Sequence, residues 1–331
     1  MTNISIGKLR GLQQLADANG MMTMCAIDHR GALKRALNEA NPAAVSYQDI
    51  VDFKLDLCQA VGPFASAILL DPEYGAAQAI AAGLLPGQKG LLVSMEKTGY
   101  AGDSGARMTE LLPDWDVKKA KRMGASAVKL LVYFRPDLKD VAVKQLDLVA
   151  RLADRCIEED IAFLVEPVSY QTREDGAASG RFGELKPDLV VETARQITAL
   201  PIDVLKAEFP GDVKLEQDEA KLMRFCRELN QASRRPWVLL SAGVDFASFR
   251  KQVEMSCRAG ASGFLAGRAL WQEGARIRSR KDRMDFFRQT SAPRLKELVE
   301  TADSYGRPWY SKLETGEGRF ARVAEGWYQS Y

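Results

Sequence analysis

The feature that most constrains the fold of this chain is a series of eight short apolar runs separated by amphipathic segments. The runs are rich in Val, Ile and Leu, lack proline and mostly do not alternate polar with apolar residues, which is typical of parallel strands buried on both faces. We predict strands at 21–27, 66–70, 90–95, 126–133, 162–166, 203–209, 237–242 and 262–267. We predict amphipathic helices between them at 46–61, 114–123, 140–158, 188–199, 214–230, 245–258 and 282–301.

Eight strands alternating with helices over roughly 250 residues predict an α/β fold, a single (β/α)8 TIM barrel. A doubly wound open sheet is the alternative, and it would normally carry a G-x-G-x-x-G turn after the first strand. Here the first strand is followed by Asp28-His29-Arg30-Gly31, which does not match. No Pro- or Ser-rich linker divides the chain, so we expect one barrel over 1–301. The aromatic C-terminal tail at 302–331 is expected to pack on the barrel or on a partner subunit.

The composition argues against several classes of function. The 46 Lys and Arg nearly balance the 44 Asp and Glu, so no broad basic face for nucleic acid is expected. No apolar run approaches the ~20 residues of a membrane-spanning helix, and the N-terminus lacks a signal-peptide core. Five scattered cysteines without a CxxC pair indicate reduced thiols, and hence a cytoplasmic protein. The single histidine, His29, leaves too few imidazoles for a zinc enzyme, so acid–base chemistry falls to carboxylates and lysines.

Four charged residues lie within or at the ends of predicted strands, where barrel enzymes place their catalysts. They are Asp28, Lys129, Glu166 and Lys206. A charge among apolar helices without a partner costs several kcal/mol, so we expect these side chains to point into the barrel. Three consecutive strands then place Lys129 and Lys206 on either side of Glu166 at similar depth. That arrangement suits imine chemistry, with either lysine as the nucleophile and the carboxylate as proton carrier.

A second group of residues is typical of a phosphate site. The last two predicted strands end in Ser241-Ala242-Gly243 and Ala266-Gly267-Arg268. Barrels frequently bind phosphate with the backbone N–H groups of these two loops. Glycine permits close approach, a serine hydroxyl can donate, and an arginine offers a bidentate charge. We therefore expect Ser241, Gly243, Gly267 and Arg268 to bind phosphate; tight turns with a surface arginine are the alternative.

Two residues at the predicted mouth of the barrel are further candidates for substrate binding. His29 is a proton relay or substrate contact, or else a hydrogen-bonded structural histidine. Arg30 either holds a second anionic group of the substrate or bridges to Asp28.

Three other features lie near the same end of the predicted barrel. Glu208 shares a strand face with Lys206 and can pair with it or assist it. Glu96 and its neighbour Lys97 are as compatible with a local ion pair as with substrate contact. Residues 170–187 form a predicted polar loop, long enough to act as a lid or a subunit contact.

Seven segments together resemble the class I (Schiff-base) tagatose-1,6-bisphosphate aldolase family. They are AIDHRGALKRAL (26–37), ILLDPEYG (68–75), EKTGY (96–100), LLPDWDVKKAKRMGASAVKLLVY (111–133), DVLKAEFP (203–210), LLSAGV (239–244) and FLAGRALW (264–271). The resemblance implies a lyase that cleaves D-tagatose 1,6-bisphosphate to dihydroxyacetone phosphate and D-glyceraldehyde 3-phosphate. We expect no cofactor and no metal.

The resemblance also implies roles for individual residues. Lys206, in the D-V-L-K segment, would form the imine, Glu166 would be the general acid/base and Lys129 the second lysine. Asp28 would orient and polarise the substrate hydroxyls. The phosphate of the dihydroxyacetone phosphate half would lie on the last two loops, at Ser241, Gly243, Gly267 and Arg268.

The chain departs from the family at His29, where the family commonly has glutamine, in the E-P-V-S-Y run after the fifth strand, and in the aromatic tail. The resemblance therefore does not determine the identity of the aldehyde half of the substrate. A 6-deoxy-6-sulfofructose-1-phosphate aldolase of the same mechanism is the first alternative. A metal-dependent enolate enzyme using Asp28, Glu166 and Glu208, and a non-catalytic sugar-phosphate sensor, are two others. The expected partner is a small sugar phosphate, and a homo-oligomer is compatible with the fold.

Overall fold

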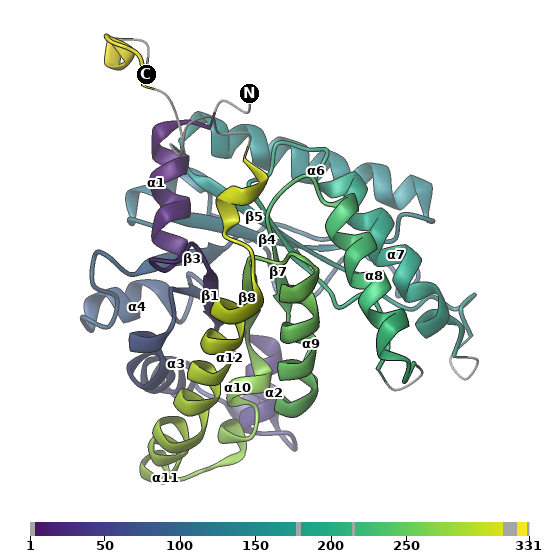
Figure 1. Ribbon diagram of the computed structural model, residues 1–331. Helices are drawn as coiled ribbons and strands as arrows, with labels where there is room; N and C mark the ends of the chain where they lie inside the picture. The colour runs from purple at the N-terminus through teal and green to yellow at the C-terminus, as the bar shows by residue number, and fades with distance from the viewer. Residues whose placement is uncertain (1–3, 177–179, 214–215, 314–322, 330) are drawn as a thin grey trace.

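The centre of the protein is a closed barrel of eight parallel strands (Figure 1), in a computed structural model that describes residues 4–176, 180–213, 216–313, 323–329 and 331. The strands are β1 (Met22–Ala26), β2 (Ala67–Leu70), β3 (Gly90–Ser94), β4 (Ala127–Tyr133), β5 (Ala162–Val168), β6 (Val204–Ala207), β7 (Trp237–Leu240) and β8 (Gly263–Ala266). Each pairs with the next in sequence, and β8 closes on β1. All eight predicted strands and the (β/α)8 barrel are confirmed.

Helices cover the outside of the barrel and one of its ends. They are α1 (Ile6–Leu15), α2 (Gly31–Leu37), α3 (Tyr47–Val61), α4 (Ala76–Ala81), α5 (Val117–Arg122), α6 (Lys139–Glu158), α7 (Arg181–Ile197), α8 (Glu219–Ala232), α9 (Phe246–Ala259), α10 (Arg268–Trp271), α11 (Arg280–Phe286) and α12 (Ala292–Tyr305). Each predicted helix overlaps an observed one; residues 214–215 of the helix predicted at 214–230 lie outside the described residues. Within the described residues, no helix has both the length and the apolar character needed to cross a bilayer.

Two predicted boundaries are wrong. The segment 282–301 is divided between α11 and α12 by a π-helical turn at Phe287–Ser291. The loop predicted to reach residue 187 instead ends at Gly180, whose φ of +68° precedes the first turn of α7. Pro187 is buried inside α7, where the helix holds a proline at the cost of one backbone hydrogen bond. Residues 177–179 lie outside the described residues.

Strand side chains alternate between the barrel interior and the layer under the helices. The interior at the N-terminal end of the strands is filled by apolar residues such as Met24, Leu164 and Val238, and α1 closes this end with Leu9, Leu12 and Leu15. A larger apolar cluster lies between the strands and the outer helices. The half of the barrel next to α1 is therefore a packed core, and polar side chains that point inward gather at the opposite, C-terminal end of the strands.

The C-terminal segment contacts the end of the barrel that α1 closes. Trp309 is 2% exposed and belongs to the interior apolar cluster, and its backbone N–H donates to the carbonyl of Gly20 at 3.0 Å. Trp327, Tyr328 and Tyr331 are exposed. Residues 314–322 and 330 of the predicted tail lie outside the described residues.

Candidate active site

The inward-facing positions of the strands carry the predicted catalytic residues into the half of the barrel at the C-terminal ends of the strands. Ala26, Ala127, Leu164 and Val204 belong to the interior cluster, and Asp28, Lys129, Glu166 and Lys206 each follow one of them by two residues. The register pairs Lys129 with Leu164 and Leu131 with Glu166, so Lys129 begins one layer deeper than Glu166. The expected similar depth is therefore wrong for the backbones. The long lysine stem still brings the ammonium to the carboxylate.

Lys129 is surrounded by three carboxylates. Its Nζ lies 2.8 Å from Asp28 Oδ2, 2.7 Å from Glu96 Oε1 and 2.8 Å from Glu166 Oε2. Burial alone would lower the pKa of Lys129, but the charges of Asp28, Glu166 and Glu96 outweigh it and raise the pKa well above its usual 10.5. Lys129 is therefore held as an ammonium ion.

Lys206 has simpler surroundings. Its Nζ lies 2.8 Å from Glu166 Oε1, and within the described ranges this is its single ion pair. Glu166 thus bridges the two lysines, with one oxygen facing each. Burial would raise the pKa of Glu166, but the charges of Lys129 and then Lys206 lower it overall, so the group is a carboxylate at neutral pH. This geometry gives Lys206 a ready proton acceptor.

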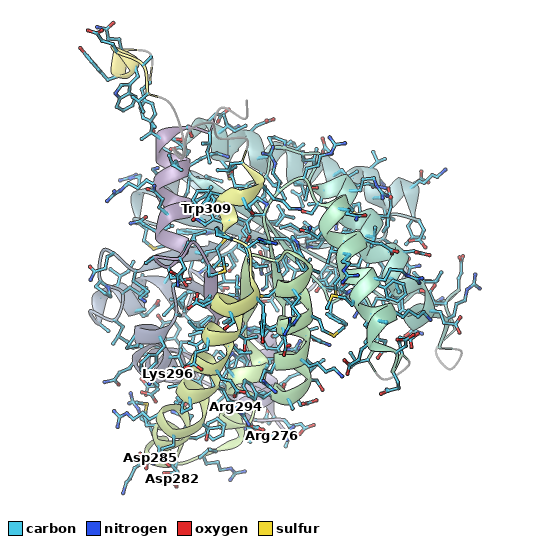
Figure 2. All side chains as sticks on the ribbon, viewed as in Figure 1. Arg276, Asp282, Asp285, Arg294, Lys296 and Trp309 are labelled. Carbon is cyan, nitrogen blue, oxygen red and sulfur yellow. The ribbon has the colours of Figure 1, made fainter. Side chains whose placement is uncertain are left out.

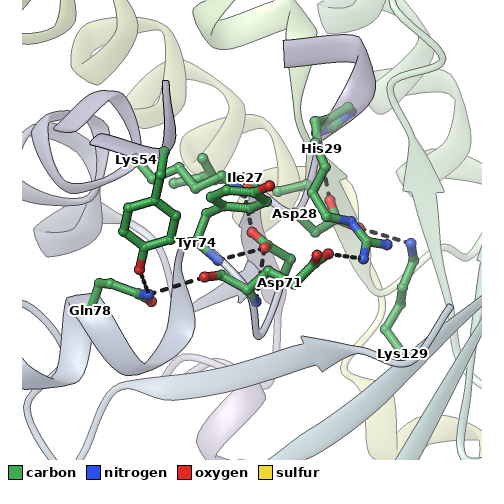
Figure 3. Close-up of polar contacts among 12 residues, drawn as sticks. Ile27, Asp28, His29, Lys54, Asp71, Tyr74, Gln78 and Lys129 are labelled. Carbon is green, nitrogen blue, oxygen red and sulfur yellow. Dashed lines mark hydrogen bonds and ion pairs between the residues drawn. The ribbon is translucent and has the colours of Figure 1, made fainter. Parts of the chain in front are cut away.

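The carboxylate of Asp28 completes the charged centre. Burial again acts to raise its pKa, and the ammonium charges of Lys129 and Lys206 hold the pKa below its usual range. Figure 3 shows Asp28 at the end of β1 with Lys129 reaching it from β4. Asp28 therefore presents a charged oxygen to any hydroxyl group that enters the barrel mouth.

Glu96 is a site residue whose place sequence reasoning did not settle. The local pairing considered for it, with Lys97, is wrong, because Lys97 pairs with Glu110 at 3.3 Å. Glu96 instead binds Lys129 and accepts the backbone N–H of Leu131 at 3.0 Å through Oε2. The alternation of strand side chains could have predicted that Glu96 points inward, because Glu96 lies four residues beyond Leu92, an interior residue of β3.

A buried ion pair supports the ends of β1 and β2 from outside the barrel. Lys54 of α3 pairs with Asp71 and donates to the carbonyl of Ile27 at 2.7 Å (Figure 3). Asp71 also accepts the backbone N–H groups of Glu73 and Tyr74 at 3.1 and 2.8 Å. Both charged side chains are fully buried. The pair fixes the chain immediately before Asp28.

Arg30 does not bridge to Asp28. Its guanidinium lies 2.5 Å from Glu73 Oε2 and donates to the carbonyl of Glu96. Through these two contacts Arg30, which follows β1, joins the loops after β2 and β3. Arg30 is 8% exposed and lines the cavity described below.

His29 faces the same mouth. Its ring packs edge-on against Trp271, with 5.0 Å between the ring centroids, and its Nδ1 lies 3.6 Å from Asp28 Oδ1. Burial lowers the pKa of His29 to about 4, with Asp28 opposing this shift and the charges of Arg268 and Lys206 adding to it. His29 is therefore neutral at pH 7.

The residues predicted to bind phosphate lie in the last two βα loops. Ser241 Oγ accepts the backbone N–H of Gly267 at 3.2 Å, which joins the two loops. Gly243 has a φ of +78°, and a Cβ there would lie 2.6 Å from the Arg268 Cζ. Only glycine lets the guanidinium of Arg268 lie this close to the loop backbone. The resulting surface combines a cation with a hydroxyl group and tightly turned backbone, which suits a phosphate.

These groups share one cavity of about 540 Å³ at the mouth of the barrel. Nine of the ten predicted site residues line it: Asp28, His29, Arg30, Lys129, Glu166, Lys206, Ser241, Gly267 and Arg268. The tenth, Gly243, lies under Arg268. Glu208 also lines the cavity, but it accepts the backbone N–H of Ser169 at 2.7 Å and lies 3.8 Å from Lys186 rather than pairing with Lys206. The volume suits a small-molecule substrate.

The carboxylates of the site converge on an amine. Where Asp28, Glu96 and Glu166 come together, the ammonium of Lys129 occupies the centre. In the part of the chain that the structure describes, no three His, Cys, Asp or Glu side chains are grouped as metal ligands.

Comparison with known proteins identifies the family. Residues 22–273 match the DeoC/LacD family aldolase. Tagatose 1,6-diphosphate aldolase 1 of Enterococcus faecalis is 35% identical over 289 residues, which cover 83% of this chain and 87% of that protein. The tagatose 1,6-diphosphate aldolase of Listeria monocytogenes serotype 4a is 32% identical, over 96% of this chain and 98% of that protein.

Solved structures show the same fold at lower identity. An archaeal fructose 1,6-bisphosphate aldolase superposes with a TM-score of 0.58 at 19% identity, over 90% of this chain and 99% of that one. The fructose-bisphosphate aldolase from Slackia heliotrinireducens superposes with a TM-score of 0.62 at 14% identity, over 97% and 96%. The match to the family and the two relatives together establish that this chain belongs to the DeoC/LacD family of aldolases and is a carbon–carbon lyase.

Proposed function

We propose that this aldolase cleaves D-tagatose 1,6-bisphosphate to dihydroxyacetone phosphate and D-glyceraldehyde 3-phosphate through an imine on Lys206. The observation that carries the proposal is the unequal environment of the two interior lysines. Three carboxylates hold Lys129 as an ammonium ion, which has no lone pair for attack. Lys206 faces one carboxylate, which can take its proton. Two relatives that are named tagatose 1,6-diphosphate aldolases support the choice of sugar.

The imine forms by proton exchange between Lys206 and Glu166. Glu166 Oε1, 2.8 Å from Lys206 Nζ, accepts a proton and leaves a neutral amine that attacks C2 of the ketose. The same carboxyl group then returns the proton to the departing C2 hydroxyl, and water leaves. The product is a protonated imine whose positive charge lies at the nitrogen of residue 206. Lys129, fixed as a cation beside Glu166, favours the return of Glu166 to its charged form.

Carbon–carbon cleavage uses the imine as an electron sink. A carboxylate, Glu166 or Asp28, takes the proton of the C4 hydroxyl group, the C4–O bond becomes a carbonyl, and the C3–C4 bond breaks. Its electron pair moves into the C2–C3 bond and neutralises the imine nitrogen as an enamine. The aldehyde leaves, C3 takes up a proton, and water hydrolyses the imine to free dihydroxyacetone phosphate and Lys206. No external oxidant or reductant is needed.

The phosphate loops fix the substrate relative to Lys206. We place the C1 phosphate on Ser241, Gly243, Gly267 and Arg268, because these groups line or support one wall of the cavity that also contains Lys206. A phosphate held there positions C2 for attack and adds the entropic advantage of a bound reactant. The contacts of Arg30 with Glu73 and Glu96 support a role in joining the mouth loops, in addition to the predicted contact with the far end of the sugar.

A coupled assay for dihydroxyacetone phosphate, the product that all three candidate substrates share, tests the proposal. D-tagatose 1,6-bisphosphate, D-fructose 1,6-bisphosphate and 6-deoxy-6-sulfofructose 1-phosphate are compared at equal concentration, each with and without EDTA. We expect the highest kcat/KM with the tagatose substrate and no loss with EDTA. Preferred cleavage of the sulfosugar would move the assignment to that aldolase. Loss of activity with EDTA, restored by a divalent cation, would replace the imine by a metal-stabilised enolate. Tight binding without cleavage would make the protein a sensor.

We place the protein in the cytoplasm. Cys25, Cys58, Cys156, Cys226 and Cys257 are all free and buried. Free thiols persist in a reducing compartment, where disulfides are rare.

A further inference from the structure

A second cavity opens beside the active-site cavity, on the outer side of Arg268. It has a volume of about 590 Å³ and lies between α2 and the segment from α10 to the short helix at Gly274–Arg276. We call it the arginine cavity, and its lining residues include Arg35, Asn38, Glu39, Arg268, Arg276 and Arg278. Figure 2 shows Arg276 at the end of the molecule that carries α2 and α11 in Figure 1, away from both chain termini. None of the chemistry proposed above uses Arg276 or Arg278.

The charges lining the arginine cavity are not balanced. Four guanidinium groups line it, against the single carboxylate of Glu39. Within the residues that the structure describes, none of these four arginines has a carboxylate partner within 4.0 Å. Elsewhere on the surface, a cavity of about 470 Å³ is lined by Arg151 and Arg155, and both are paired, with Asp147 at 3.2 Å and Glu158 at 2.6 Å. Arginines that line a surface cavity therefore need not be left unpaired in this chain.

Two of the four arginines also line the active-site cavity. Arg35 and Arg268 belong to both cavities, so they form a shared wall. Burial lowers the pKa of Arg268 below its usual value; Glu166 opposes the shift, and the positive charge of Arg35 adds to it. The two guanidinium groups are thus close enough to repel one another. An anion bound next to them would remove that repulsion.

We propose that the arginine cavity binds a small anion with two or more phosphoryl groups, and that this anion competes with the substrate phosphate for Arg268, beside Arg35 in the shared wall. Guanidinium groups bind phosphoryl oxygens in bidentate pairs, and four of them match the charge of more than one phosphoryl group. The volume of the cavity suits a ligand of that size. Binding by Arg276 and Arg278 stands independently of the reaction; the competition rests on the proposed function.

Because the two cavities share arginines, binding of one ligand should lower the affinity of the protein for the other. An anion in the arginine cavity draws the Arg35 and Arg268 charges away from the active-site cavity and places a like charge near the substrate phosphate. The two ligands therefore weaken each other, and the factor is the same in both directions because the coupling is a free energy.

The binding test uses tripolyphosphate as the probe. Isothermal titration calorimetry measures its affinity for the full chain and for the double variant Arg276→Gln/Arg278→Gln, at constant ionic strength set with potassium chloride. The matched control is Arg151→Gln/Arg155→Gln, which removes the same charge from the cavity whose arginines are paired. We expect the first variant to raise Kd by about tenfold or more and the control to change it less than about twofold. Equal Kd values for the two variants would overturn the proposal.

The competition test measures steady-state kinetics with the sugar bisphosphate. We expect tripolyphosphate to raise KM without lowering kcat. In Arg276→Gln/Arg278→Gln, KM without the anion should be unchanged and the inhibition weakened by the same factor as the binding. Undiminished inhibition in this variant would show that the anion binds only at the substrate phosphate site, and it would overturn the proposal that the arginine cavity is a second anion site. Calorimetry with Lys206→Met separates the two proposals, because this variant should bind tripolyphosphate like the parent whether or not Lys206 forms an imine.

Discussion

Lys129 and Lys206 carry the same functional group, and their neighbours give them different tasks. The three carboxylates around Lys129 stabilise its charged form, and the single carboxylate at Lys206 can serve as its base. Glu96 is central to this difference because it pairs with Lys129 and, unlike Glu166 and Asp28, has no part in the proposed proton transfers. Its second oxygen is fixed by the backbone N–H of Leu131.

Replacing Glu96 with glutamine tests this arrangement. The amide oxygen can still accept the Leu131 N–H, but the negative charge is gone. The charge of Lys129 then acts more strongly on Glu166, lowers its basicity further, and slows proton transfer. We expect kcat to fall about tenfold while the thermal midpoint changes little. Glu110→Gln, which removes an exposed carboxylate from the neighbouring loop, is the control and should leave kcat unchanged. An unaltered kcat in Glu96→Gln would argue against the role of Glu96.

His29 should make the stability of the protein depend on pH. Its pKa is about 4 in the folded protein against 6.5 in an unfolded chain, so the unfolded state takes up a proton first as the pH falls. Stability associated with His29 is therefore complete above about pH 6.5 and is lost between pH 6.5 and 4. We expect this loss to be about 3 kcal/mol, since the two pKa values differ by about 2.5 and each unit corresponds to about 1.4 kcal/mol.

His29→Gln removes the titrating group, and urea unfolding at pH 7.0 and pH 4.5 compares the two proteins. The stability of the variant should fall less between these two pH values than that of the parent. Parallel losses in both proteins would show that His29 is not the group responsible.

At the scale of elements, the buried pair Lys54–Asp71 joins α3 to the ends of β1 and β2. Removing one partner leaves the other charge buried and unpaired, so we expect Lys54→Met to lower the free energy of unfolding by about 3 kcal/mol or more. Asp71→Asn in the same chain should restore part of the loss, because asparagine is neutral and keeps an oxygen for the backbone N–H groups of Glu73 and Tyr74. Urea unfolding measures both variants. A double variant no more stable than the single one would contradict this explanation.

The strands were predictable because a strand buried on both faces appears in the sequence as a continuous run of apolar residues. The same logic placed Lys129, Glu166 and Lys206 inside the barrel, since a lone charge under the helices would be too costly. Loops leave a weaker trace. The polar loop predicted to reach residue 187 ends at Gly180, and the contacts of Arg30 with Glu73 and Glu96 depend on how three separate loops fold together, which periodicity does not encode.

At the scale of the whole molecule, the two ends of the barrel have separate tasks. The end closed by α1 and Trp309 is a packed apolar core, and the opposite end carries the charged cavity. Barrel closure also brings Arg35, after β1, beside Arg276, after β8, although they are far apart in the sequence. Neither the arginine cavity nor the packing of Trp309 could be placed from the sequence, because both depend on loops and ends whose positions the closed barrel sets.

This separation predicts that Trp309→Ala lowers stability without lowering activity. Trp309 is almost fully buried at the end of the barrel opposite the cavity, so its removal should cost about 3–5 kcal/mol. At a temperature where the variant stays folded, kcat should remain within about twofold of the parent value. Trp327→Ala, at an exposed position, should change stability by less than about 0.5 kcal/mol. Denaturant unfolding and steady-state kinetics together check the prediction, and a large loss of kcat in Trp309→Ala would contradict it.

The most direct test of the imine on Lys206 is reduction with sodium borohydride in the presence of dihydroxyacetone phosphate, followed by peptide mass spectrometry. The reduced adduct is expected on Lys206 and not on Lys129, and Lys206→Met should be unlabelled and inactive while remaining folded. An adduct on Lys129, or full activity in a folded Lys206→Met protein, would contradict the mechanism.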